Sequence, residues 1–354
     1  MRPLNADAAC NTSLKRMKKI LSDCSPSSQT SYSFSDVSDN DCTSDFIPST
    51  SDEDDDGDID RLSLHCTQKR IMQDSVNYIG LHEDHLYILD LLATHIPYSS
   101  RVTALTRKDC VLMVLMIIRT GMACYIVADM FGVSKSWVSR TFARCVPVMA
   151  SCLKGLVRWP PSEVIKQRLP NSFKAYYNNV ETIIDCFEIE IEKPSSAMSQ
   201  SMTWSDYKKC NTVKYLISCT PSGLINFISS GRPGRCSDME LLKESGYLDH
   251  LKPGTTVLSD RGFKEVEGHL VARGCHLIRP KSVAKDEHLT AKNVFQMKTI
   301  AGLRIHIERV IRRVRVFKFL EMHSGIRLSM VDLLDDIVQM VCGLVNLQPR
   351  IVKV

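Results

Sequence analysis

The sequence predicts an α/β protein in which a mixed sheet with flanking helices follows an all-helical region. Three observations carry this prediction. The run VETIIDCFEIEIEKPS, at residues 180–195, is rich in β-branched and aromatic residues that favour strands. Short apolar runs and helical stretches alternate after it, whereas residues 81–145 show helical periodicity.

Length and charge narrow the class of protein. The chain has 354 residues and a net charge of +5, which is enough length for two or three domains. Residues 1–60 hold 5 basic and 13 acidic side chains, so the rest of the chain is strongly basic. An acidic tail on a basic body indicates a polyanionic partner, and nucleic acid is the first candidate. The alternative is a soluble protein whose surface is slightly basic and has no such partner. The Ser- and Asp-rich tail, residues 1–60, is expected to be disordered.

Cysteine spacing and hydropathy exclude other classes. None of the 14 cysteines forms a C-x-x-C pair, so a zinc site is disfavoured and reduced thiols inside the cell are expected. The first residues lack the apolar run of a signal peptide, and no segment has the length of a membrane span. We therefore expect no membrane partner.

A helix-turn-helix is predicted within residues 105–178, after a helical lead-in at 61–104. A first helix at 124–131 is followed by Gly132 and by Ser134, a good N-cap for a second helix over 135–145. The second helix of such a pair enters the DNA major groove, although an ordinary helical hairpin is the alternative. Its inward face is expected to comprise Ala128, Val133, Val138 and Phe142. Its outward, DNA-facing residues are expected to be Lys135, Ser136, Ser139 and Arg140.

The element order after about residue 178 predicts the topology of the second domain, residues 179–349. Strands at 214–221 and 224–230, joined by a turn at Ser222-Gly223, follow the first strand. Next come a helix at 238–245, a strand ending at Asp260, a helix at 264–273, a strand at 276–280 and helices at 294–317 and 329–347. Three antiparallel strands followed by strand–helix alternation form a ribonuclease-H-like mixed sheet, in which ligands sit at the carboxyl ends of strands.

Three acids are placed where such a fold could bring them together. Asp185 interrupts the apolar first strand, Asp260 ends a later strand, and Glu308 lies beside the expected buried stripe of the 294–317 helix. Taken singly, each has an ordinary explanation: a strand-end acid, a turn-forming Asp or a helical salt bridge. Together they supply the oxygen ligands that Mg²⁺ prefers, and two ions would need about three carboxylates. The buried stripe is expected to comprise Ile300, Leu303, Ile307, Ile311 and Val314, with His306 on another side.

These residues resemble the eukaryotic DDE-superfamily endonucleases, the Harbinger-type transposases and relatives that often carry a THAP zinc finger. The resemblance extends from about residue 105 to 349, some two-thirds of the chain, although the N-terminal cysteines lack the spacing of that finger. The matching strings, in family order, are FGVSKSWVSRTF, RWP, IIDCFEIEIEKPS, TWSDYKKCNTVK, GRPGRCSD, LSDRGF and RIHIERVIRRV. The resemblance implies that Asp185, Asp260 and Glu308 are the catalytic triad that holds Mg²⁺ or Mn²⁺, and that residues near 105–150 form the family's helix-turn-helix.

Other polar residues are candidates for support of the site or for DNA contact. Trp204, Lys208 and Lys214 either contact the DNA backbone or position their loop. Asp238 is either an acid behind the site or, as favoured here, a helix N-cap. Arg304 and Arg312 belong to a basic helix that could follow phosphates, with a solvated basic face as the alternative.

The sequence therefore predicts a metal-dependent DNA endonuclease or transposase, with possible strand transfer, that acts in the nucleus. A homo-oligomer on DNA and an accessory DNA-binding protein are further expected partners. The alternative is a host-adopted, non-catalytic DNA-binding protein derived from a transposase, and a weaker one is an RNA-processing nuclease on the same fold.

Overall fold

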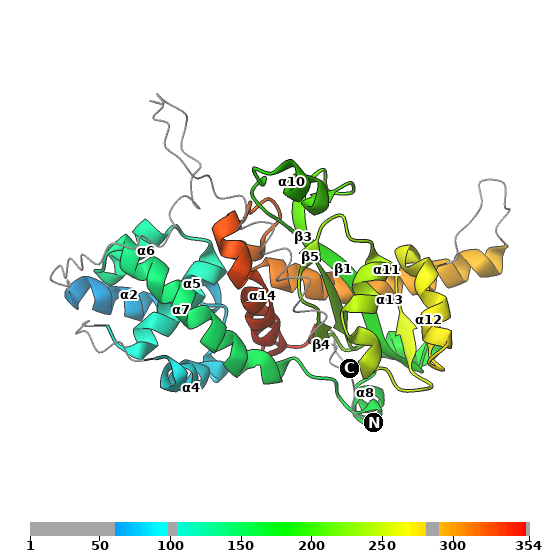
Figure 1. Ribbon diagram of the computed structural model, residues 1–354. Coiled ribbons are helices and arrows are strands. Elements are labelled where there is room, and N and C mark those ends of the chain that lie inside the picture. Colours follow the sequence, from blue (N-terminus) through cyan, green and yellow to red (C-terminus); the bar gives the residue numbers. More distant parts are fainter. Residues whose placement is uncertain (1–60, 98–104, 281–289, 352–354) are drawn as a thin grey trace, which may run out of the picture.

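The computed structural model describes residues 61–97, 105–280 and 290–351. The acidic tail predicted at residues 1–60 lies outside these ranges. A helical part and a sheet part stand side by side, and helix α14 (Val331–Asn346) lies between them (Figure 1). In chain order, the helices before the sheet are α2 (Arg61–Gln73), α3 (Ser75–Tyr78), α4 (Tyr87–His95), α5 (Arg107–Thr120), α6 (Cys124–Phe131), α7 (Lys135–Leu153), α8 (Ser162–Gln167) and α9 (Asn171–Tyr176).

Local signals define the predicted helix-turn-helix, α6 and α7. Gly132 ends α6 with φ of 65°, a left-handed conformation that glycine adopts without steric cost. The Ser134 side chain then accepts a hydrogen bond from the Trp137 amide and so caps α7. Ala128, Val138 and Phe142 are buried as expected, while Val133 is only half-buried.

Helix α7 is longer than predicted, since it continues to Leu153 through Pro147. A proline inside a helix costs about 3 kcal/mol because it removes one backbone hydrogen bond. Beyond Pro147 the buried side chains of Met149, Ala150 and Leu153 face the hydrophobic core. Burial of these apolar groups offsets the cost of the proline, so the helix extends past the predicted end at residue 145.

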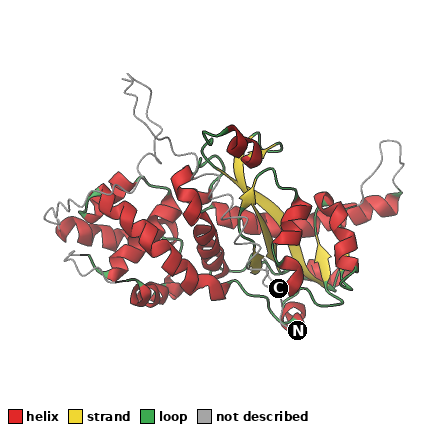
Figure 2. Ribbon diagram, viewed as in Figure 1, coloured by secondary structure: helices red, strands yellow, loops and turns green. Residues whose placement is uncertain are grey.

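The sheet has the predicted ribonuclease-H-like order. Strands β4, β3, β1, β6 and β7 follow one another across it, and the short β2 and β5 also pair with β3. Figure 2 shows the strands in yellow with helices on either side. β1 runs antiparallel to β3 and parallel to β6, and β6 runs parallel to β7. The strands are β1 (Val180–Glu190), β2 (Trp204–Ser205), β3 (Cys210–Cys219), β4 (Ile225–Ile228), β5 (Arg232–Pro233), β6 (Thr256–Leu258) and β7 (His276–Ile278).

Element ends depart from prediction where the chain turns sharply. β3 begins at Cys210, earlier than expected, because a tight turn at residues 206–209 pairs it with β2. β6 ends at Leu258 rather than at Asp260, which instead caps a 3₁₀ helix, η4 (Arg261–Val266). The helix expected over 264–273 is therefore split into η4 and the short α12 (Glu267–Val271).

Helices cover both faces of the sheet, and the alternation along β1 assigns each side chain to a face. Ile183, Phe187 and Ile189 belong to the large core shared with α13 and α14. Ile184 belongs to a second core, formed with α11 and α12. Asp185 has the parity of Ile183 and Phe187, so it faces α13. The helices of this part are α10 (Ala197–Thr203), α11 (Asp238–Glu244), α12, α13 (Ala291–Arg315) and α14, with 3₁₀ turns at Tyr247–His250, Lys318–Leu320 and Leu328–Met330.

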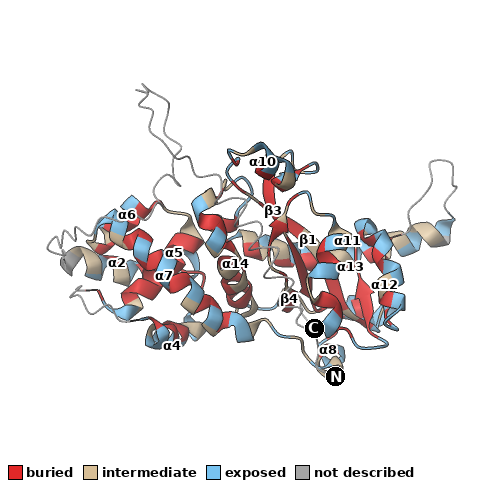
Figure 3. Ribbon diagram, in the orientation of Figure 1, coloured by how far each residue is buried: buried red, intermediate tan, exposed pale blue. Residues whose placement is uncertain are grey.

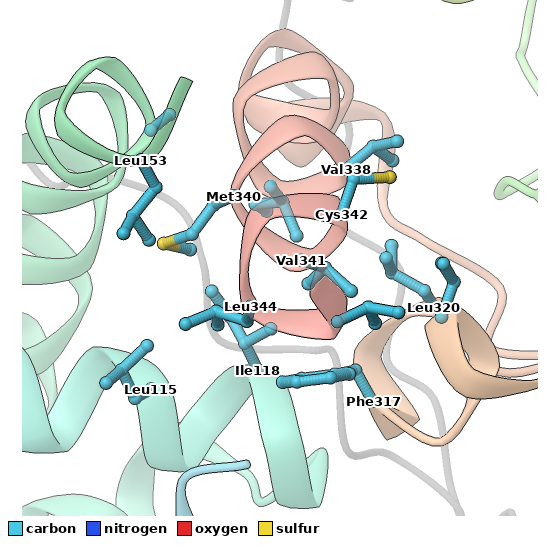
Figure 4. Packing of buried hydrophobic residues seen from close by; sticks show 14 of the residues in the cluster. Leu115, Ile118, Leu153, Phe317, Leu320, Val338, Met340, Val341, Cys342 and Leu344 are labelled. Atoms are coloured by element: carbon cyan, nitrogen blue, oxygen red, sulfur yellow. The ribbon is translucent and has the colours of Figure 1, made fainter. Parts of the chain in front are cut away.

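The large core runs without interruption from the helical part into the sheet part. Buried residues concentrate along α5, α7, α14 and the sheet (Figure 3). Figure 4 shows Met340, Val341 and Leu344 of α14 packed among residues of α5, α7 and the segment after α13. Each such side chain contributes about 1.5–3 kcal/mol on burial, so α14 holds the two parts together. None of the described helices combines the length and apolarity that a bilayer crossing requires.

Candidate active site

The parallel pairing of β1 with β6 places Asp185 beside Asp260. Ile183 of β1 is in register with Leu258 of β6. Asp185 lies two residues after Ile183, and Asp260 lies two residues after Leu258. Adjacent strands lie about 4.8 Å apart, so continuing this register brings the two acids to neighbouring positions. The two carboxylates are close enough for the charge of Asp260 to raise the pKa of Asp185. The structure therefore brings together the first two acids of the predicted triad.

The Asp260 carboxylate is oriented by its own turn. Its Oδ1 accepts a hydrogen bond of 2.8 Å from the Gly262 amide at the start of η4. A Cβ at position 262 would lie 3.1 Å from Asp260 Oδ1 and 3.3 Å from Asp238 Oδ2. Glycine thus lets two carboxylates converge on one stretch of backbone, which a larger residue would obstruct.

Glu308 joins the site through an arginine. One guanidinium nitrogen of Arg304 lies 3.6 Å from Asp185 Oδ2 and 3.9 Å from Glu308 Oε1. Because Arg304 and Glu308 are four residues apart on α13, they share one side of the helix. The Arg304 side chain is mostly buried, and its Nε has no hydrogen-bond partner among the described residues. A cationic group therefore sits between two of the three predicted metal ligands.

Burial dominates the electrostatics of Asp185. The pKa of the carboxyl rises from 3.8 to about 6, mainly because of burial, and the charges of Asp260 and Asp238 act in the same direction. The Arg304 guanidinium and the Cys186 amide, which donates to Asp185 Oδ1 at 2.8 Å, oppose the rise. A carboxylate that is this costly to ionise in the metal-free protein is suited to a cationic partner stronger than one shared arginine.

Asp238 is a fourth acid at the site, and its favoured interpretation as a helix cap is wrong. Ser237 caps α11 through a capping box with Glu240, and Asp238 is the first residue of the helix. Its carboxylate approaches Gly262 and lies 3.4 Å from the Lys214 ammonium. The sequence signal was present, since Ser237 followed three residues later by Glu240 is itself a capping-box pattern.

Lys214 was predicted either to contact the DNA backbone or to position its loop, and its contacts in the structure favour the positioning role. Its ammonium donates to the Cys236 carbonyl at 2.8 Å and lies 3.6 Å from Glu188 Oε1, in addition to Asp238. Burial opposes its charge, but the carboxylates of Asp238 and Glu188 outweigh burial and raise the pKa of Lys214. The side chain is only 12% exposed, so it links β3 and β1 to α11 rather than facing a ligand.

The carboxylates of Asp185, Asp260 and Glu308 are chemically suited to a hard divalent cation, but they do not lie close enough together to bind one in this structure. Carboxylate oxygens are what Mg²⁺ and Mn²⁺ prefer. Among the described residues, however, no group of three or more acidic, histidine or cysteine side chains is close enough to hold a metal ion. Arg304 accounts for part of this, because its guanidinium lies between Asp185 and Glu308. Glu308 is also 56% exposed and would have to turn inward.

The remaining predicted DNA contacts lie in different settings. Lys135, Ser136 and Arg140 are exposed at the start of α7. Ser139 is only 5% exposed, so the expectation that it faces outward is wrong. Its position on α7, one residue after the fully buried Val138, turns it toward the core.

Two more predicted contacts come from the sheet part. Lys208 is half-buried, with its ammonium 4.9 Å from the centre of the exposed Tyr207 ring. Arg312 is exposed on α13. His306, expected on another side of that helix, is buried against Phe173 and donates from Nδ1 to the Pro221 carbonyl at 2.7 Å. In the buried stripe, Val310 is fully buried and the predicted Ile311 only half-buried.

Comparison with protein families identifies the class that this fold and site define. A family model described as "DDE superfamily endonuclease" matches residues 184–346, and one described as "Helix-turn-helix of DDE superfamily endonuclease" matches residues 103–155. Comparisons with curated proteins and with solved structures gave no significant match. The chain belongs to the DDE superfamily of transposase-like endonucleases, and it carries the helix-turn-helix of that superfamily ahead of the endonuclease domain.

Proposed function

We propose that this protein cleaves DNA phosphodiester bonds with the help of a divalent cation, as a transposase or a descendant of one. The observation that carries the proposal is the β1–β6 register, which brings Asp185 beside Asp260 at the edge of a ribonuclease-H-like sheet, with Glu308 on the covering helix. The helix-turn-helix would hold the DNA, and a protein with this substrate would work in the nucleus.

Asp185, Asp260 and Glu308 would hold Mg²⁺ or Mn²⁺. Such ions lower the pKa of a bound water and stabilise the charge that develops on the leaving oxygen. The chain's own contribution is orientation: the Gly262 amide aims Asp260, and the Cys186 amide aims Asp185. Arg304 would move from the carboxylates toward a phosphate when a cation and DNA enter. Asp238, held by Lys214, would add negative potential behind the ligands.

A plasmid-nicking assay tests the proposal. The full chain is incubated with supercoiled DNA in Mg²⁺ or Mn²⁺, and the wild type is compared with Asp185→Ala and Asp260→Ala. Each substitution should reduce cutting by at least about 10³-fold, while DNA binding in EDTA is retained. The exposed Asp249 provides the matched control, because Asp249→Ala also removes one carboxylate but should cut normally. Undiminished cutting by both site variants would reject the assignment.

Strand transfer is a separate part of the proposal. If the freed 3′-hydroxyl attacks a second duplex, a reaction with DNA that carries the flanking ends of the protein's own gene should give joined products as well as nicks. Nicks without joined products would limit the activity to hydrolysis.

One observation favours a second candidate, a DNA-binding protein without cleavage activity. In the described residues the carboxylates are not gathered around a metal position, and Arg304 occupies the space between two of them. Thermal stability separates the candidates. Mn²⁺ should raise the melting temperature of the wild type, and not that of Asp260→Ala, only if the acids close around an ion.

A further inference from the structure

A hollow rich in arginine lies on the opposite side of α13 from the carboxylates. It consists of two connected depressions, of about 450 Å³ and about 140 Å³, that share Arg168, Ser222 and Leu224. They are bounded by α8, the β3–β4 turn and the tail that follows α14, segments that also lie together in Figure 1 near the C-terminus. We call this feature the arginine hollow. Its four cationic residues are Arg158, Arg168, Arg313 and Arg350.

No acidic side chain lines the arginine hollow in the described part of the chain. Elsewhere around the sheet arginines have carboxylate partners, as in the pairs Arg232–Glu244, Arg279–Glu267 and Arg304–Asp185. Of the four arginines in the hollow, only Arg313 has a described partner, the Pro349 carbonyl, which is neutral. Like charges gathered without counter-charges repel one another and create a positive potential that a polyanion relieves.

The arginines come from four separate segments that tertiary packing has gathered. Arg158 precedes α8, Arg168 follows it, Arg313 lies on α13, and Arg350 lies in the tail. Two contacts fix α13 against its neighbours here: His306 donates to Pro221 in the β3–β4 turn, and Arg313 donates to Pro349 of the tail. The half-buried Ser222 lines the same hollow, and its hydroxyl is of the type that donates to phosphate oxygens.

The geometry separates this surface from the catalytic one. Glu308 and Arg313 are five residues apart on α13, which places them roughly 140° apart around the helix axis. Arg309, also exposed, lies one turn before Arg313 on the same flank. A ligand in the arginine hollow therefore does not touch the carboxylates. Arg158 is at the border with a neighbouring hollow that does contain acids, so Arg168, Arg313 and Arg350 define the feature best.

We propose that the arginine hollow binds the phosphate backbone of a duplex DNA segment away from the point of cleavage. This rests on the proposed function, since it assumes that DNA is the polyanion at hand. Several cations spread over one surface match phosphates that recur along a strand better than one isolated phosphate. Bidentate guanidinium groups and neutral hydroxyl donors are the usual phosphate contacts, and they carry no base specificity. The hollow would thus add affinity and orient the duplex, independent of its sequence.

The test measures DNA binding without cleavage. The full chain is titrated against a fluorescent duplex of random sequence, in EDTA, over a series of salt concentrations. Arg168→Ser/Arg350→Ser removes two exposed charges from the hollow. For this variant, the slope of log K against log[salt] should be shallower by about 2, and the affinity for DNA should be about tenfold lower. Arg168→Lys/Arg350→Lys keeps the charge and should retain most of the slope.

The matched control is Lys252→Ser/Arg273→Ser, which removes two exposed charges beside β6 and β7. It should bind with the wild-type slope. The inference is overturned if the hollow variant keeps the wild-type slope and affinity, or if the control loses as much as the hollow variant. Plasmid nicking by the same preparations keeps the two proposals apart. If the hollow variant keeps the wild-type salt dependence while the wild type nicks plasmid normally, only the proposal for the arginine hollow is refuted. If the hollow variant has a shallower salt dependence but the wild type does not nick plasmid, only the nuclease proposal is refuted.

Discussion

The two flanks of α13 carry the same residue type in opposite settings. On one flank Arg304 lies between Asp185 and Glu308, so its charge is balanced by acids of the chain. On the other, Arg313 opens into a hollow whose described lining holds no acid. The difference teaches that a basic helix is not one functional surface. Arginines that are balanced internally serve the site and the fold, and unbalanced ones are available to a polyanionic ligand.

The largest effect is expected from a substitution on the flank of α13 that faces Asp185. Glu308→Gln removes the charge of a proposed metal ligand but keeps the shape of the side chain, so metal-dependent nicking should fall by at least about 10³-fold. DNA binding in EDTA should be unchanged. Glu321→Gln, at an exposed acid beyond α13, is the control and should cut normally. Wild-type nicking by Glu308→Gln would remove this residue from the site.

Lys214 tests whether an internally balanced cation acts on the fold rather than on DNA. Lys214→Met leaves Glu188 and Asp238 without their shared partner in a mostly buried setting. The free energy of unfolding should drop by about 3 kcal/mol in urea denaturation. Lys208→Met, which alters a half-buried lysine without a carboxylate contact among the described residues, should change it by about 0.5 kcal/mol or less. Unchanged stability with weaker DNA binding would restore Lys214 as a DNA contact.

The ionised carboxylate of Asp185 should lower the free energy of unfolding of the metal-free protein, and replacement by an amide should raise it. The pKa of about 6 in the folded state exceeds the ordinary 3.8, so the folded state binds this proton more tightly than the unfolded state does. The free energy of unfolding should therefore fall as pH rises from about 4 to about 6.

Asp185→Asn removes this penalty. At pH 7.5 in EDTA it should be more stable than the wild type by about 2 kcal/mol, and the advantage should vanish below about pH 4. Chemical denaturation across this pH range measures the difference. An amide variant that is less stable than the wild type at pH 7.5 would show that the Arg304 contact outweighs burial.

The smallest effect is expected at Arg304, and it tests whether this side chain competes with a cation for the carboxylates. In the proposed mechanism the guanidinium leaves the carboxylates before a cation enters. Arg304→Gln should therefore lower the Mn²⁺ concentration for half-maximal thermal stabilisation by about fivefold, or about 1 kcal/mol. Arg312→Gln, at an exposed neighbour on α13, should leave that midpoint in place. A weaker response to Mn²⁺ in Arg304→Gln would instead make the arginine a support for the ligands.

Much of the fold could be predicted because its signals are short-range. Gly132 and Ser134 define the helix-turn-helix within a few residues, and Ser222-Gly223 defines the hairpin of β3 and β4. The β-branched run around Ile183 and Ile184 makes β1 recognisable. These features depend on backbone preferences and local hydrogen bonds, so a window of about ten residues contains the information.

What only the tertiary structure decided is which charge meets which. The parallel register sets Asp185 against Asp260, 75 positions later in the numbering, and the packing of α13 brings Arg304 between Asp185 and Glu308. Burial of Ser139, pairing of Lys214 and the gathering of the hollow's arginines likewise depend on neighbours distant in the chain. The sequence alone determined the element types, the three candidate acids and the superfamily. It could not determine electrostatic partners, because the strength of a charge interaction depends on separation in space and on burial, and neither can be read from order along the chain.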